Sequence, residues 1–104
     1  MPAAPDPELA EKLFSYGLKA YFRRSFADAE DELLNAVRNN NQDARYRYFL
    51  GLARLQQGKI EAAQDDFRQA AALERQGLPD SRAINACFER IQGAERQLID
   101  RFRP

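Results

Sequence analysis

The sequence predicts an all-α fold in which short helical hairpins follow one another along the chain. Two glycines, Gly17 and Gly51, lie 34 residues apart, and each stands between apolar neighbours. The same spacing of 34 residues separates Ala29 from Ala63. A period of this length is typical of a repeated pair of helices, and such pairs stack because one pair cannot bury its apolar face alone. No segment alternates between apolar and polar residues as a strand would.

Residues at the expected helix ends of the first hairpin have capping chemistry. Asp6 can accept backbone N–H bonds, and Pro7 has no N–H to leave unsatisfied, so a helix is expected to start here. Ser25, followed three residues later by Asp28, is a variant of the capping box and predicts a second start. Three consecutive asparagines at 39–41 predict a turn, because asparagine bonds to its own backbone and tolerates left-handed conformations.

Glycine and proline delimit the second hairpin. Gly58 is expected to end the third helix and Gly77 the fourth, because glycine readily adopts the left-handed conformation found after helix ends. Pro79 then prevents continuation, and Asp80 or Ser81 provides an N-cap for a last helix. The expected helices span residues 7–23, 25–38, 42–57, 60–75 and 80–102.

The last expected helix is apolar on one side only, and its other residues are largely Arg, Glu, Gln and Asp. A stack of helix pairs exposes an apolar end unless a helix with a polar outer face covers it, so we expect a cap here. The seven-residue spacing of Ile84, Ile91 and Leu98 also permits a coiled-coil contact. The expected buried stripe consists of Ile84, Cys87, Phe88, Ile91, Ala94, Leu98 and Phe102.

Length and composition restrict the function classes. A chain of 104 residues is one domain, and its 16 basic and 16 acidic residues remove the overall attraction that nucleic-acid binders use. The sequence has no histidine and one cysteine, Cys87, which we expect to be a buried structural thiol. We therefore expect no catalytic residues, no metal site and no cofactor, and predict that the protein is not an enzyme. The absence of a signal-peptide pattern and of a long apolar run predicts a cytoplasmic protein without a membrane partner.

Residues 10–77 resemble two tetratricopeptide repeats. The family pattern W-x2-L-G-x2-Y, then A-x3-F, is matched in the second repeat by Leu50, Gly51, Ala63 and Phe67. The resemblance implies a right-handed superhelix of antiparallel helix pairs. Close packing between helices is implied for Gly17, Ala29, Leu33, Ala36, Gly51, Ala63, Phe67 and Ala70. The chain then divides into a disordered tail over residues 1–6, two helix pairs over 7–79 (repeats 10–43 and 44–77) and a capping helix over 80–104.

In this family the first helix of each repeat lines a concave face that commonly holds a peptide or a partner helix. The resemblance implies a partner-binding groove formed by Phe14, Leu18, Tyr21, Phe22, Arg45, Tyr48, Phe49, Leu52 and Leu55. The first and third helices carry seven basic and three acidic residues, whereas the second and fourth carry eight acidic and four basic ones. We therefore expect a basic, aromatic groove and a protein adaptor or scaffold whose partner segment is amphipathic with acidic flanks.

Three alternatives remain open at this point. The aromatic residues could be core beneath the C-terminal helix, with the charges forming a solvated face. The protein could be a self-associating structural module, a homodimer through the groove or through the C-terminal helix, because large exposed apolar patches rarely stay unpaired. The run Arg45-Tyr46-Arg47-Tyr48 interleaves cations with rings as single-stranded nucleic-acid binders do. Consecutive helical residues point in different directions, however, which favours a protein partner over nucleic acid.

Overall fold

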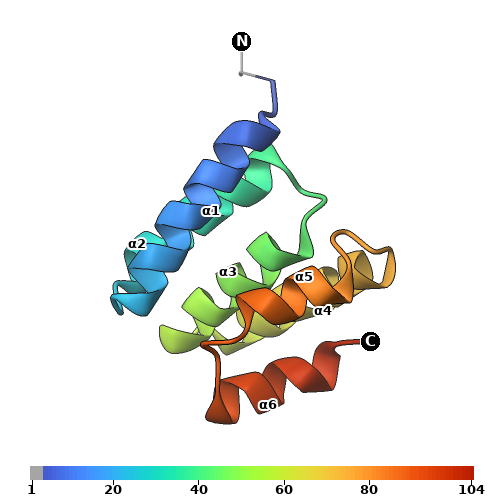
Figure 1. The fold of residues 1–104 in the computed structure, drawn as a ribbon. Helices are drawn as coiled ribbons and strands as arrows, with labels where there is room; N and C mark the ends of the chain where they lie inside the picture. The colour runs from blue at the N-terminus through green and yellow to red at the C-terminus, as the bar shows by residue number, and fades with distance from the viewer. Residues whose placement is uncertain (1–3) are drawn as a thin grey trace.

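The computed structural model describes residues 4–104, and every regular element in this range is a helix (Figure 1). The predicted all-α fold of helical hairpins is thereby confirmed. Residues 1–3 of the predicted tail lie outside the described residues. The helices are α1 (Pro7–Phe22), α2 (Phe26–Asn39), α3 (Ala44–Gln56), α4 (Ile60–Arg75), α5 (Ser81–Cys87) and α6 (Gly93–Phe102).

The helix ends follow most of the predicted capping signals. The Asp6 carboxylate accepts the backbone N–H groups of Glu8 and Leu9, and Asp80 caps α5 in a similar way. Ser25 precedes α2 but makes no side-chain hydrogen bond to the helix, so the predicted capping box does not form. Side-chain caps thus mark the starts of α1 and α3, whereas α2 and α4 begin without one.

The two hairpins share the same internal packing. α1 packs against α2, α3 packs against α4, and the pairs meet where α2 packs against α3 (Figure 1). A methyl group placed on Gly17 would lie 2.6 Å from Cγ of Leu33, and one on Gly51 would lie 2.6 Å from Cε1 of Phe67. Leu33 and Phe67 are themselves 34 residues apart, so the sequence period corresponds to a repeated helix crossing.

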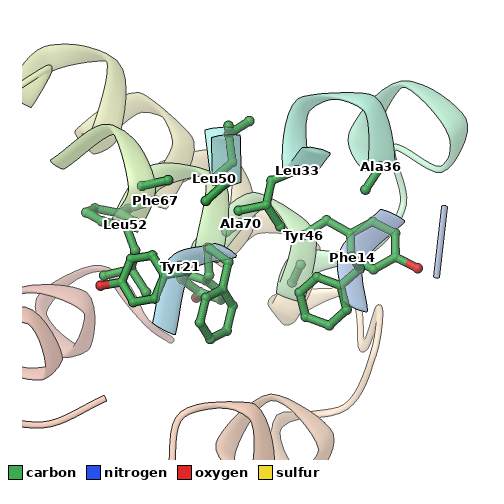
Figure 2. Close-up of a cluster of buried hydrophobic side chains, with 14 of the residues drawn as sticks. Phe14, Tyr21, Leu33, Ala36, Tyr46, Leu50, Leu52, Phe67 and Ala70 are labelled. Carbon is green, nitrogen blue, oxygen red and sulfur yellow. The ribbon is translucent and has the colours of Figure 1, made fainter. Parts of the chain in front are cut away.

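These crossings lie inside one continuous apolar core. Figure 2 shows Leu33 from α2 and Phe67 from α4 among its buried side chains. The family resemblance assigned close packing to eight residues, and all are buried: Gly17, Ala29, Leu33, Ala36, Gly51, Ala63, Phe67 and Ala70. The two hairpins are therefore buried at equivalent positions.

The C-terminal region differs from the single helix predicted over residues 80–102. It forms two helices, α5 and α6, separated by residues 88–92. Gly93 has a φ of 70°, a conformation that glycine adopts without steric penalty, and it marks the turn. Nη1 of Arg96 lies 3.2 Å from the Phe88 carbonyl oxygen and donates to it across the break. The prediction of one continuous helix was wrong because Gly93 was treated as an interior helical residue.

The break also redirects the apolar stripe. α5 crosses in front of α3 and α6 runs beside α4 (Figure 1). Ile84, Phe88 and Ile91 are buried, whereas Ala94 is exposed and the buried residue of α6 is Ile99. The expected continuous stripe therefore becomes two separate contacts, one between α5 and α3 and one between α6 and α4 at the end of the stack.

We expect Gly51→Ala to lower the free energy of unfolding by up to about 2 kcal/mol. Overpacking costs about 1–3 kcal/mol and here exceeds the ~1 kcal/mol by which alanine favours a helix over glycine. Urea denaturation followed by far-UV circular dichroism measures the difference, with Ser15→Ala on the exposed side of α1 as the control. Equal or greater stability of Gly51→Ala would contradict a tight crossing at this position.

Candidate functional site

The residues predicted to form the groove gather on one face of α1 and α3. Phe49 lies at the centre, with its ring centroid 5.9 Å from those of both Phe14 and Tyr21 and 6.3 Å from that of Phe22. The edge-on geometry of these contacts is favourable for aromatic rings. The buried members of the predicted set are Phe14, Tyr21, Tyr48, Phe49 and Leu52, and the half-buried members are Leu18, Phe22, Arg45 and Leu55. We call this set the concave face.

The chain's own C-terminal segment, residues 81–103, covers the concave face with α5 and the turn after it, whereas its α6 lies against α4. The Phe88 ring lies 5.3 Å from that of Tyr48 and 5.7 Å from that of Phe49, centroid to centroid. The Arg90 guanidinium lies 3.8 Å above the Phe22 ring at the edge of the contact. The concave face is therefore occupied in this structure, and its central aromatics are core beneath the segment.

A buried carboxylate holds the end of this segment. Glu74 of α4 is only 5% exposed, and its two oxygens lie 3.0 and 2.6 Å from Nε and Nη2 of Arg103. The Tyr48 hydroxyl donates to the same carboxylate at 2.7 Å. Burial raises the pKa of Glu74, but the hydrogen bonds from Arg103 and Tyr48 outweigh it and lower the pKa below its ordinary value. Glu74 is thus ionised, and removing its arginine would leave a buried charge without its cation.

Arg103 also connects the parts of the segment to each other. Its Nη1 lies 2.6 Å from Oδ1 of Asn85 in α5, and its guanidinium lies 5.3 Å from the centroid of the Phe88 ring. Sequence reasoning missed this residue because it follows the last expected helix. A planar guanidinium is suited to such a position, since it can donate in several directions while one face lies on a ring.

The arginines of α3 contribute less to the concave face than their number predicts. Arg47 and Arg54 are seven residues apart on one side of the helix, and this side contacts α2 and α4. The sum of the charges in each helix does not contain the direction in which each arginine points. The ion pairs are Arg45 with Glu11 and Asp43, Arg47 with Asp66, and Arg54 with Glu30 and Asp66.

Glu30 joins the two hairpins electrostatically. Its carboxylate accepts hydrogen bonds from Lys59 at 2.7 Å and from Arg54 and Gln57 at 2.9 Å each. Burial raises the pKa of Glu30, but these hydrogen bonds outweigh it and lower the pKa to about 2. The carboxylate of α2 therefore stays ionised well into the acid range and holds α3 and the start of α4.

The fold covers two other candidate features, one fully and one in part. Tyr46 and Tyr48 are 1% and 0% exposed, so their rings are not available for the base stacking that single-stranded nucleic-acid binding requires. Cys87 is half-buried on α5, and burial raises the pKa of its thiol. A raised pKa keeps the sulfur protonated and weakly nucleophilic at neutral pH.

We expect Glu30→Gln to lower the free energy of unfolding by about 1–3 kcal/mol at neutral pH, the range for hydrogen bonds to charged groups. Because the folded pKa of Glu30 lies below the ordinary value, its stabilisation is complete above about pH 4.5 and is lost as the pH falls toward 2. The variant should therefore lose less stability than the wild type over this range. Urea titrations at several pH values test this, with the exposed Asp31→Asn as control; parallel pH profiles would contradict the role of Glu30.

Three further findings concern the class of the protein. Residues 4–104 contain no group of three or more cysteine, aspartate and glutamate side chains placed to hold a metal ion. Over the same range, no helix combines the length and apolar character needed to cross a bilayer. Comparison of the chain with protein-family models, with curated proteins and with solved structures gives no match.

Proposed function

We propose that this protein is a non-catalytic interaction module of the tetratricopeptide type, whose concave face binds an amphipathic segment with an aromatic anchor. The observation that carries the proposal is the position of Phe88 against Tyr48 and Phe49. The repeated helix crossing at Gly17 and Gly51 supports the assignment to this type of repeat.

The C-terminal segment indicates which chemistry the concave face accepts. Its buried side chains are Ile84 in α5 and Phe88 and Ile91 in the turn that follows, so the concave face accepts a short helix that continues into a non-helical stretch. At the far end of the segment, Arg103 makes the polar contact by donating to the buried carboxylate of Glu74. A partner segment of this kind would carry an aromatic residue between two aliphatic ones and a cation further along.

The covering segment has features that would allow a partner to replace it. α5 has only seven residues, and helices this short are not stable in isolation. The polar attachment of the segment to α4 depends on Arg103. A tethered segment acts at an effective concentration in the millimolar range, so a partner must bind more tightly than the segment or act when Arg103 is released.

The proposal is tested with a labelled peptide of residues 80–104 offered to the wild type and to a Phe88→Ala/Arg103→Gln double variant. We expect the double variant to bind the peptide at least about tenfold more tightly, because its own segment no longer occupies the concave face. Fluorescence anisotropy gives the two dissociation constants. A peptide carrying Phe88→Ala should lose this binding.

An Arg101→Gln variant serves as the matched control, since Arg101 is an exposed arginine of α6 and should behave as the wild type does. A double variant that stays helical and fails to bind the peptide would overturn the proposal. So would a double variant that loses its cooperative unfolding transition and does not recover it with the peptide, since the concave face would then be core only. Light scattering distinguishes peptide binding from exchange of segments between two copies.

A further inference from the structure

The two ends of the helix stack differ in how they are covered. At the C-terminal end α6 lies beside α4, with the Phe102 ring 5.5 Å from that of Phe67. At the N-terminal end, the side of α1 that faces away from α3 carries Leu9 and Tyr16, which are 40% and 48% exposed. The fold therefore closes one end and leaves apolar side chains accessible at the other. We call this side of α1, with the adjoining side of α2, the outer face.

The internal repeat indicates what such a face can bind. Tyr16 lies 34 residues before Leu50 of α3, which is fully buried, and α3 packs against α2. Arg23 lies 34 residues before Gln57, whose side-chain amide donates to Glu30 of α2 at 2.9 Å. The positions that α2 covers in the second hairpin thus have equivalents in the first hairpin that no helix of residues 4–104 covers.

The outer face is hollowed at these equivalent positions. A cavity of about 290 Å³ lies between α1 and α2. Within residues 4–104, Lys19 and Arg23 of the α1 wall form no ion pair, Nε of Arg23 donates to the Ser25 hydroxyl at 3.4 Å, and the facing α2 wall carries three carboxylates. The cavity is lined by Tyr16, Lys19 and Arg23 of α1 and by Asp28, Asp31 and Glu32 of α2.

We propose that the outer face binds an amphipathic helix of a partner protein that has the chemistry of α2. Its apolar side would cover Tyr16 and Leu9, and a carboxylate in the role of Glu30 would pair with Arg23 and Lys19. This inference is independent of the concave face and of any occupant there.

A second copy of this chain cannot readily supply that helix. The carboxylate that would be needed, Glu30, is already held by Arg54, Gln57 and Lys59 within its own fold. The α2 helix of a second copy could dock only by leaving α3, which would separate its two hairpins. The occupant is therefore a helix from another protein, oriented with its carboxylate toward Lys19 and Arg23 of the α1 wall and away from the three carboxylates of the α2 wall.

The probe is a labelled, helix-stapled peptide of residues 25–41, the sequence of α2 itself. We expect it to bind the folded protein, and Tyr16→Ala and Arg23→Glu should each weaken binding by about tenfold or more. A peptide with Glu30→Lys should bind the wild type poorly and the Arg23→Glu protein well. This exchange of charges tests the orientation of the helix as well as its presence. Tyr16 and Arg23 are exposed, and circular dichroism verifies that both variants remain folded.

Matched controls use exposed residues away from the outer face, Ile60→Ala for the apolar contact and Arg75→Glu for the charge, and both should leave binding unchanged. Binding that is insensitive to Tyr16→Ala and Arg23→Glu would overturn the inference, because the peptide would then be replacing α2 on α3. A dimer in light scattering that Tyr16→Lys converts to a monomer would also overturn it, since the outer face would then belong to a second copy. Absence of peptide binding to the monomeric wild type is the third contrary result.

Discussion

The close crossing of the helices within each hairpin is the constraint on which the other contacts depend. Gly17 lets Leu33 of α2 approach the backbone of α1, and Gly51 does the same for Phe67 of α4. Because the two hairpins have the same internal geometry, they stack with α2 against α3. This stacking brings the aromatic residues of α1 and α3 onto one face, where Phe49 contacts rings from both sides. The glycines have no side chain that could bind a partner, yet the close helix crossings they allow determine where the aromatic side chains lie together.

The hairpins could be predicted from the sequence because their signals are local. Asp6, Gly58 and Gly77 act within a few residues, and the 34-residue period needs only comparison of the chain with itself. The C-terminal region could not be predicted in the same way. A continuous apolar stripe favoured one long helix, whereas Gly93 adopts a positive φ at the turn that follows Phe88. A glycine inside an otherwise regular pattern was the available signal.

Two rings that meet beneath the C-terminal segment, Tyr48 and Phe49, belong to the predicted groove set, whereas the sequence left their exposure undecided and did not give the charge around them. Helical periodicity places Tyr48 and Phe49 near one side of α3, and the structure brings them together. Whether they face solvent depends on residues 81–103, which no local rule places. The prediction of a basic groove failed for a related reason. Arg54 belongs to a helix with a basic excess, yet it points toward Glu30 and Asp66. The electrostatic potential of a surface depends on where its charged side chains point, and the net charge of a helix does not contain that information.

The position of Phe67 has a consequence for how mutational effects combine. One part of its ring lies against the site of Gly51, and its centroid is 5.5 Å from that of Phe102 in α6. A single side chain therefore belongs both to the crossing of the second hairpin and to the cover at the end of the stack. Residues that share a partner are seldom energetically independent. A double-mutant cycle between Gly51 and Phe102 should thus give a coupling energy, even though the two residues belong to different helices.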